Sequence, residues 1–598
     1  MKNEKLILSV EDYVVIVAML FVSTGIGLYF HLTSKKKTNE EYLLAGKDMS
    51  VLPVALSLMA TLTSTSSVMG IPAEMYLYGT NLAFLNLGFA IGPIIAAYIF
   101  LPIFFVNDVS TAYEYLEKRF GTTARRLISA MFAFQSLLFT GAALYAPALA
   151  LSAVTNLSMK MSVIVIGFVC TSYCTLGGMK AVLWADVFQT ILMFAALFAI
   201  IIKGFMLLGS IGRIFEIANE GGRLVIPRFT LDPEAPYSMF SVFAQGMIIT
   251  MSSYAGSQTQ VQRLRTLKNL NKSKLAAFLS IPLLVSFNLL CCLCGLIIYA
   301  YFRFCDPLTS PDSPIASADQ LLPYFITTTL SDFPGLPGLC ICGIFSASLS
   351  TASSSINSLA SVTSEDFLKP IFPSHNVTVF HNKIISLVFG VLCVGMSFLV
   401  ASLGHLVKIS IIILGLVNGP NLAVFFLAAC TTRANEKGVI LGILVSLVLS
   451  AYLSFSPKTK PYPFLPLSNE CPSEAAESTS STFSTLSYSS TSFYFNTTFS
   501  STSRPETEDD SFHVSYMWIS TLAFITCFIV AYFGSVIISC LGGKSSEVPD
   551  IYLSPIRTKF FKTQTNTEGQ KYKYRAVKAE IKEKSVETGF SLTVSSPN

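Results

Sequence analysis

Long apolar runs separated by short polar segments dominate the pattern of this 598-residue chain. A membrane core of roughly 30 Å is crossed by about 20 residues of apolar helix, and thirteen runs reach about this length. The predicted spans are 11–31, 51–71, 82–105, 127–154, 161–177, 181–202, 236–258, 275–302, 320–358, 384–402, 407–430, 438–456 and 515–541. The pattern therefore predicts an all-α polytopic membrane protein with about 13 transmembrane helices.

Glycine and proline divide two of these apolar runs. Gly177 and Gly178 allow a tight turn between the fifth and sixth spans. Pro334 and Pro337 separate a short lead-in from the helix proper in the ninth span, because proline interrupts the helical hydrogen bonds that precede it.

The composition agrees with a membrane protein and excludes a soluble enzyme. Hydrophobic residues make up 52% of the chain and charged residues 13%, with a mean hydropathy of +0.60, whereas soluble proteins contain about 25% charged residues. The 13 cysteines lie mostly in apolar runs and there are five histidines. Few residues are therefore available as ligands for a zinc ion. We expect no catalytic residues, no nucleic-acid partner, and a lipid bilayer as the surroundings.

The basic residues between the spans predict the orientation. An odd number of spans places the termini on opposite sides, and Lys and Arg concentrate in short cytoplasmic loops. With the amino terminus outside, these loops hold the main basic clusters, at 35–37, 118–126 and 263–274. We expect a plasma-membrane protein with an extracellular amino terminus and a cytoplasmic carboxyl terminus. No small-residue cleavage site follows the first span, which we expect to be retained.

The segment 457–514 is extracellular in this topology. From Ser473 to Ser503, 19 of 31 residues are Ser or Thr, a composition too polar to form a packed core. Asn496 begins an Asn-Thr-Thr acceptor sequence and is the predicted N-glycosylation site. Cys305 and Cys471 both lie outside in this topology and are a candidate disulfide pair.

The second span contains a hydroxyl-rich run, ATLTSTSSVMG at 60–70. Six of the seven residues 61–67 are Ser or Thr, and their side chains compete with the backbone for hydrogen bonds. Gly70 and Pro72 weaken the helix further. We therefore predict a break near the bilayer centre, where free carbonyl groups can ligate a cation.

The ninth span contains a second such run, FSASLSTASSSIN at 345–357. On a helix, Ala347, Ser350, Thr351, Ser354 and Ser358 share one face, because they are three and four residues apart. Hydroxyl groups on one face of a membrane helix either connect neighbouring helices or coordinate a small hard cation. The pattern alone leaves both interpretations open.

The seventh span repeats the feature of the second. Gly256, with Ser257 and Gln258 after it, indicates either a second break or the cytoplasmic end of an ordinary helix. The two spans are five apart, as in an inverted repeat of five helices, and this favours a break. In the sixth span, Asp186 and Gln189 lie on one face near the cytoplasmic end. A carboxylate at this position either lies at the membrane–water interface without a further role or attracts sodium ions that leave toward the cytosol.

Four stretches of the chain resemble the sodium/solute symporter family: GIPAEMYLYG at 70–79, GGMKAVLWADVFQ at 177–189, SQTQVQR at 257–263 and FSASLSTASSSINSLASVTSEDF at 345–367. The resemblance extends from about Glu11 to Ala451 and resumes in the last span. It implies a LeuT-like core of five plus five helices. The units are then 1–50 with the first helix, 51–208 and 236–430 as the two repeats, the extracellular loop 209–235, 431–456 with span 12, the loop 457–514, 515–541 with span 13, and the cytoplasmic tail 542–598.

The same resemblance implies a site between the second and ninth spans. The sodium ligands are then the carbonyl groups of Ala60, Thr63 and Ala347 and the hydroxyl groups of Ser350 and Thr351. Asp186, with Gln189 beside it, assists sodium binding or release. The candidate substrate contacts are Thr61, Ser64, Ser67 and Gln258, which are equally well explained as polar groups of helix packing.

The motifs fit the branch of the family that transports monocarboxylates, vitamins and iodide. We expect a sodium-coupled symporter that imports a small organic anion, such as a monocarboxylate, biotin or pantothenate, by alternating access. The alternatives are sodium-coupled transport of iodide or another inorganic anion, sodium-coupled transport of a sugar, polyol or choline, and a channel. Two departures bear on the substrate: Ala185 stands where the family often has Thr, and Ala255-Gly-Ser-Gln258 replaces the more usual Gly-x-Asn-Gln.

Overall fold

The computed structural model describes residues 8–33, 38–155, 158–310, 315, 317–372, 377–400, 406–455, 464–468, 514–541 and 548–560. These residues are almost entirely helical, and an isolated bridge between Arg228 and Ser238 is the β-pairing found among them. The helices of the first half are α1 Val10–Thr33, α2 Asn39–Leu44, η1 Ala45–Lys47, α3 Val51–Leu62, η2 Ser66–Gly70, α4 Ile71–Tyr78, η3 Gly79–Phe84, α5 Leu85–Ile99, α6 Leu101–Val106, α7 Ala112–Arg119, α8 Thr122–Val154, α9 Met159–Leu208 and α10 Ile211–Glu220.

The second half continues in the same way. Its helices are α11 Met239–Gly256, α12 Gln258–Leu264, α13 Leu270–Tyr301, η4 Ala318–Gln320, α14 Leu321–Thr329, α15 Leu336–Val362, η5 Thr363–Leu368, α16 Lys369–Ile371, α17 Val379–Val400, α18 Leu406–Cys430, α19 Glu436–Phe455, η7 Tyr516–Trp518, α20 Ile519–Cys540, η8 Asp550–Tyr552 and α21 Pro555–Phe560. Each of the thirteen predicted spans therefore has a helical counterpart. The predicted division of the ninth span is confirmed, because α14 ends at Thr329 and α15 begins at Leu336.

By length and composition, ten helices of the described residues qualify as membrane spans, or eleven if one bent pair counts as a span. Three differences separate ten from the predicted thirteen. The first is that α3 qualifies only as part of the bent pair formed by Asn39–Lys47 and Val51–Leu62. α9 counts once, although Gly178 within it has non-helical angles (φ 60°, ψ −159°) and joins two helices across a kink. α11 does not qualify, because Gln245 and several hydroxyl residues lower its mean hydropathy. The protein is an all-α polytopic membrane protein.

Both predicted helix breaks are present. α3 ends at Leu62, and Thr63 has extended backbone angles (φ −92°, ψ 107°) before the helix resumes. α11 ends at Gly256, and Ser257 is likewise extended (φ −88°, ψ 121°) before α12 begins. An extended residue inside a membrane helix frees carbonyl groups, and such groups are tolerated only where protein covers them or a cavity is lined.

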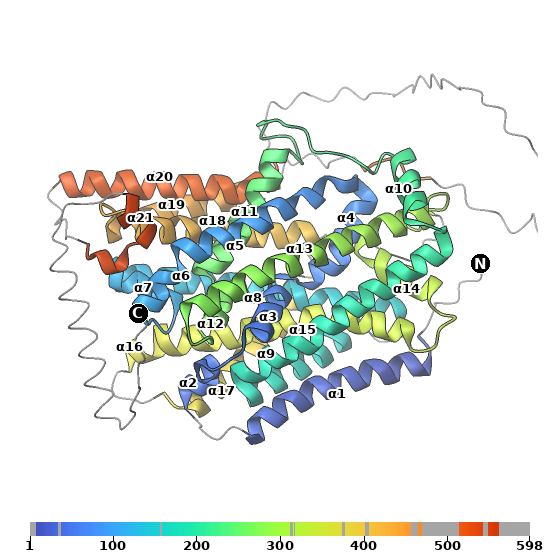
Figure 1. The fold of residues 1–598 in the computed structure, drawn as a ribbon, viewed down its shortest axis with the longest axis horizontal. Helices are drawn as coiled ribbons and strands as arrows, with labels where there is room; N and C mark the ends of the chain where they lie inside the picture. The colour runs from blue at the N-terminus through green and yellow to red at the C-terminus, as the bar shows by residue number, and fades with distance from the viewer. Residues whose placement is uncertain are drawn as a thin grey trace, which may run out of the picture.

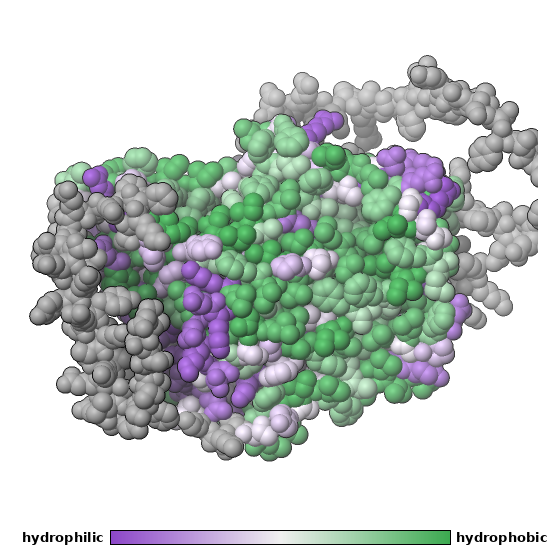
Figure 2. Space-filling model, in the orientation of Figure 1, coloured by the Kyte–Doolittle hydropathy of each residue, from purple (hydrophilic) through white to green (hydrophobic). Residues whose placement is uncertain are grey.

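The hydroxyl-rich helix α15 lies at the centre of the bundle. In the most apolar stretch of this helix 94% of the residues are buried, whereas the share is 22% in the corresponding stretches of α1 and α20. Figure 1 shows α1 and α20 at opposite edges of the bundle, with α15 and α9 between them. In Figure 2, apolar side chains cover the middle of the visible face and hydrophilic ones gather toward its two ends, as expected for a molecule surrounded by lipid.

Glycine allows the closest helix contacts. A Cβ at Gly88 of α5 would lie 2.4 Å from the carbonyl oxygen of Phe243, and a Cβ at Gly246 of α11 would lie 2.4 Å from that of Leu85. These distances show two backbones in contact, which is the usual way for small residues to join membrane helices.

A buried ion pair ties α8 to the end of α15. Arg125 of α8 donates from Nε to Asp366 Oδ1 at 3.0 Å, and the Asp366 side chain is fully buried. Ser129 and Thr111 donate hydroxyl hydrogens to the same carboxylate, at 2.6 and 2.8 Å. The pair therefore fixes η5 and the start of α7 to α8.

Two predicted features fall partly or wholly outside the described residues. Cys305 is disulfide-bonded, in agreement with half of the predicted pair, but Cys471 lies outside the described residues. The predicted glycosylation site Asn496 also lies outside them. Within them, α1 begins and α20 ends at opposite ends of the bundle (Figure 1), as an odd number of crossings requires.

Replacing Gly178 by alanine should destabilise the protein more than the same change at Gly209. Both glycines have positive φ, 60° and 94°, so alanine at either position costs about 1–3 kcal/mol of backbone strain. A Cβ at Gly178 would also lie 2.7 Å from the carbonyl oxygen of Tyr42, whereas a Cβ at Gly209 would meet no atom within 4 Å. Thermal unfolding of both purified variants tests this, and equal losses would contradict it.

Candidate functional site

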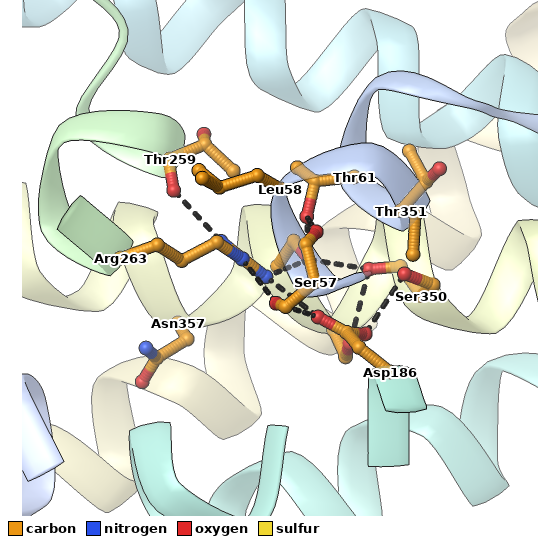
Figure 3. A network of polar contacts seen from close by, with 12 residues as sticks. Ser57, Leu58, Thr61, Asp186, Thr259, Arg263, Ser350, Thr351 and Asn357 are labelled. Carbon is orange, nitrogen blue, oxygen red and sulfur yellow. Dashed lines mark hydrogen bonds and ion pairs between the residues drawn. The ribbon is translucent and has the colours of Figure 1, made fainter. Parts of the chain in front are cut away.

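A buried ion pair lies at the centre of the candidate site. Arg263 of α12 donates from Nη2 to Asp186 Oδ2 of α9 at 3.1 Å, and both side chains are 0% exposed. Figure 3 shows the two side chains pointing toward one another among residues of α3 and α15. Charges at such depth are costly unless they are paired and hydrogen-bonded, so this pair requires further partners.

Serine hydroxyl groups from two other helices supply those partners. Ser57 of α3 donates to Asp186 Oδ2 at 2.5 Å and accepts from Arg263 Nε at 2.7 Å. Ser350 of α15 donates to Asp186 Oδ1 at 2.8 Å, and Ser354, one turn further along α15, accepts from Arg263 Nη2. Both halves of the ion pair are therefore bonded to both α3 and α15.

The network also reaches the two broken helices. Thr61, at the end of α3, lies 3.2 Å from Ser354 between hydroxyl oxygens. Arg263 belongs to α12, which begins directly after the break at Ser257, and its Nη1 donates to the carbonyl of Thr259 at 2.7 Å. One set of hydrogen bonds thus connects the broken helix of each repeat with α9 and α15.

All five predicted sodium ligands are buried on the two helices that this network joins. Ala60 and Thr63 stand at the broken end of α3, and Ala347, Ser350 and Thr351 stand on α15. The Thr61–Ser354 contact holds these two segments together. The structure therefore brings the two halves of the predicted ligand set to facing elements.

The hydrogen bonds of the two predicted hydroxyl ligands leave their lone pairs available. Ser350 donates its hydrogen to Asp186, and Thr351 donates its hydrogen to the carbonyl of Ala347 at 3.0 Å. A hydroxyl oxygen has two lone pairs besides its hydrogen, and a carbonyl oxygen also has two. Oxygen atoms of this kind suit a small hard cation.

Gln189 lies on α9 and is fully buried. Neither its amide oxygen nor its amide nitrogen has a hydrogen-bond partner among the described residues. A buried amide without partners costs about 1–3 kcal/mol, which is regained if a ligand satisfies it. The predicted association of Gln189 with a bound ion fits this observation.

The predicted substrate contacts have different surroundings. Thr61 donates to the carbonyl of Ser57 at 2.7 Å, and Ser64 lies 2.5 Å from Ser66 between hydroxyl oxygens. Ser67 lies in η2, directly after the break. Gln258 is bonded to the start of α7, because its Oε1 accepts from Ala112 N at 2.9 Å.

Sequence reasoning missed two members of the network and left the role of a third open. Ser57 and Arg263 were not predicted, and the sequence left Ser354 between helix packing and ion binding. A signal for Arg263 was present, since a carboxylate in a membrane span requires a cationic partner and Arg263 ends the SQTQVQR motif. Sequence spacing could not reveal the pairing, because the two residues are 77 positions apart.

Sequence reasoning also missed a cluster of buried amide side chains on α18. Asn418 accepts from Gln135 of α8 at 3.1 Å, and Asn421 donates to Ser252 of α11 at 3.4 Å. Asn418 Nδ2 and Asn421 Oδ1 have no partner among the described residues. Ser252, which Asn421 contacts, lies one turn before the break that ends α11. η2 also packs against α18.

Comparison with known proteins agrees with this architecture. The sodium:solute symporter family matches residues 42–446. A putative sodium-dependent multivitamin transporter of Drosophila melanogaster is 38% identical over 89% of this chain and 86% of its own length. Sodium-coupled monocarboxylate transporter 2 of Bos taurus is 35% identical over 92% and 87%, and sodium-coupled monocarboxylate transporter 1 of Homo sapiens is 33% identical over 91% and 89%.

A solved structure is similar over nearly the whole chain. A Na⁺-coupled sialic acid symporter, in a substrate-bound outward-open state, aligns with a TM-score of 0.71 at 20% identity, covering 90% of this chain and 100% of that one. At this identity the likeness establishes the LeuT-like fold. Together with the family match, it identifies the chain as a member of the sodium:solute symporter family, a multi-pass sodium-coupled transporter and not an enzyme.

Proposed function

We propose that this symporter imports a small organic anion, a monocarboxylate or a vitamin carboxylate such as biotin or pantothenate, together with sodium. Relatives named as monocarboxylate and multivitamin transporters, at 33–38% identity over most of the chain, support this substrate class. The orientation in the proposal is an extracellular amino terminus and a cytoplasmic carboxyl terminus in the plasma membrane. The observation that carries the proposal is the buried Asp186–Arg263 network, since it links the broken helix of each repeat.

The proposed sodium site consists of five neutral oxygen atoms. They are the carbonyl oxygens of Ala60, Thr63 and Ala347 and the hydroxyl oxygens of Ser350 and Thr351. Asp186 supplies negative charge one hydrogen bond away, because Ser350 donates to it at 2.8 Å. Arg263 offsets part of that charge, so the site attracts sodium without holding it as tightly as a direct carboxylate ligand would.

Binding of sodium at this site would couple to the broken helices. Sodium bound by α3 and α15 stabilises the conformation in which these helices face each other, and the network extends that preference to α12 through Arg263. A ligand shifts a conformational equilibrium only by its difference in affinity between the two states. We propose that the break at Thr63 provides this difference, because a displaced α3 removes two of the five ligands.

The proposed substrate site lies beside the two breaks. A helix that begins within the membrane presents N–H groups and a positive dipole end to an anionic group. Thr61, Ser64 and Ser67 flank the first break, and Gln258 follows the second. Asn418 adds an unpartnered amide donor. Hydroxyl and amide donors of this kind suit a carboxylate group of the substrate.

The membrane potential would drive accumulation. Each positive charge that enters an inside-negative cell without compensation contributes about 2.3 kcal/mol per 100 mV. This free energy corresponds to roughly 40-fold accumulation per uncompensated charge.

Radiolabelled uptake in sodium and in choline buffer tests the proposed function. We expect sodium-dependent, saturable uptake of lactate or pyruvate, or of biotin or pantothenate, in cells that express the protein. Iodide should not be accumulated. Sodium-dependent iodide uptake without carboxylate uptake would contradict the anion class, and sodium-independent, non-saturating flux would indicate a channel.

Thr351→Ala should weaken sodium activation without a matching loss of protein. It removes one of five proposed ligands, and we expect the half-saturating sodium concentration to rise about tenfold, which corresponds to about 1.4 kcal/mol. Ser358→Ala is the matched control, because Ser358 likewise donates to a carbonyl four residues back in α15 and is not a proposed ligand. Thr351→Ser should retain sodium affinity. Equal shifts for Thr351→Ala and Ser358→Ala would contradict the assignment.

Asp186→Asn should raise the half-saturating sodium concentration about 10- to 100-fold. The change removes the negative charge and leaves Arg263 uncompensated beside the site, where hydrogen bonds to charged groups contribute about 1.5–3 kcal/mol each. Asp366→Asn is the control, since it breaks the other buried ion pair described above, at Arg125. It should reduce surface expression and leave sodium activation of the remaining transporters unchanged. An equal effect of both variants on sodium activation would contradict a specific role of Asp186.

A further inference from the structure

A cavity of about 510 Å³ lies where the end of α1, the kink of α9 and the start of α17 meet. It is separate from the network around Asp186. Its lining includes Lys180 and Gly177 of α9, Lys383 of α17, His31 of α1, and Thr38 and Tyr42 at α2. In the proposed topology this end of the bundle faces the cytoplasm.

Among the described residues, the charged side chains that line this cavity carry a net positive charge. Lys180 and Lys383 are cationic, and Glu41 is the acidic lining residue among the described ones. Lys383 Nζ donates to His31 Nδ1 at 3.2 Å. The cavity therefore favours an anionic group.

An apolar groove of about 770 Å³ continues from the cavity along α1 and α9. Tyr29 and Phe30 line both hollows. The remaining lining residues are uncharged: Val22, Gly25, Ile26, Trp184, Val187, Phe188 and Ile191. Val22, Trp184 and Ile191 are 46%, 42% and 60% exposed, so the groove opens to the lipid side of the bundle.

We infer that the cavity and the groove together bind one anionic phospholipid of the inner leaflet. The phosphate and an anionic headgroup would contact the ammonium groups of Lys180 and Lys383, and an acyl chain would lie in the groove between α1 and α9. A zwitterionic phosphatidylcholine headgroup fits less well, because it brings a quaternary ammonium group toward the two lysines. The continuity of a cationic cavity with a lipid-facing apolar groove is specific to an amphipathic occupant.

The site lies against the kink of α9. Lys180 is two residues after Gly178, and a Cβ at Gly177 would lie 3.1 Å from Gly27 Cα of α1. The bound lipid would therefore bridge α1, α9 and α17 beside the kink at Gly178. This inference does not depend on which anion the symporter carries.

Tryptophan fluorescence tests the inference without a transport assay. The chain has two tryptophans, Trp184 and Trp518, so Trp518→Phe leaves Trp184 in the groove as the single emitter. The protein is reconstituted in phosphatidylcholine vesicles containing a small fraction of brominated lipid. We expect brominated phosphatidylserine to quench Trp184 several-fold more than brominated phosphatidylcholine at equal mole fraction. Equal quenching by the two lipids would overturn the inference.

Charge variants separate the headgroup site from general surface charge. Lys180→Gln/Lys383→Gln should abolish the preference for brominated phosphatidylserine. Lys268→Gln/Lys272→Gln removes the same charge from exposed positions at α13 and should leave the preference intact. Loss of preference in both double variants would indicate a diffuse electrostatic effect. Millimolar inorganic phosphate should not change the quenching, and a reversal by phosphate would indicate a soluble anion as the occupant instead.

A glycine variant tests the acyl groove independently. Gly25 lines the groove, and a Cβ there would meet no atom within 4 Å, so Gly25→Phe places a ring in the groove and should reduce quenching by brominated phosphatidylserine. Gly395→Phe is the matched control on α17, where a Cβ also meets no atom within 4 Å. If brominated phosphatidylserine quenches Trp184 equally in Gly25→Phe, in Gly395→Phe and in the parent protein, no acyl chain occupies the groove.

Discussion

Two opposite charges without access to water, Asp186 and Arg263, impose the strictest requirement on the packing of this molecule. Removing either partner of such a pair leaves a buried charge uncompensated, at a cost of about 3–5 kcal/mol. The hydroxyl groups of Ser57, Ser350 and Ser354 must therefore stay within hydrogen-bond reach of the pair. This requirement determines how α3, α9, α12 and α15 meet, and the proposed sodium ligands follow from that meeting.

The helix breaks and the hydroxyl-rich helix were predictable because their causes are local. Serine and threonine side chains in residues 61–67 compete with their own backbone, and the structure has an extended residue at Thr63. The breaks at Thr63 and Ser257 occur where composition alone predicts them. Burial of α15 on all sides also follows from its small residues, since only a helix surrounded by protein retains so many hydroxyl groups in a membrane.

The partners across the bundle were not predictable from spacing. Arg263 belongs to a motif at the end of a predicted span, where an arginine is ordinarily exposed to water or headgroups. Its burial depends on a carboxylate 77 residues away and on two serines of other helices. Likewise, the sequence predicts a turn at Gly178, but not the contact with Tyr42 of α2, whose carbonyl oxygen would lie 2.7 Å from a Cβ at this position.

The placement of charge also bears on how tightly sodium is held. A symporter must release its ion on each cycle, and a carboxylate in direct contact with sodium at low dielectric would oppose release strongly. Here the carboxylate lies behind Ser350 and faces an arginine, so its attraction reaches the ion weakened by distance and by the opposite charge. The five proposed ligands are neutral, and two of them depend on the broken end of α3. A small displacement of that end would therefore change the sodium affinity of the proposed site, and this would connect the break in the helix to the release of the ion.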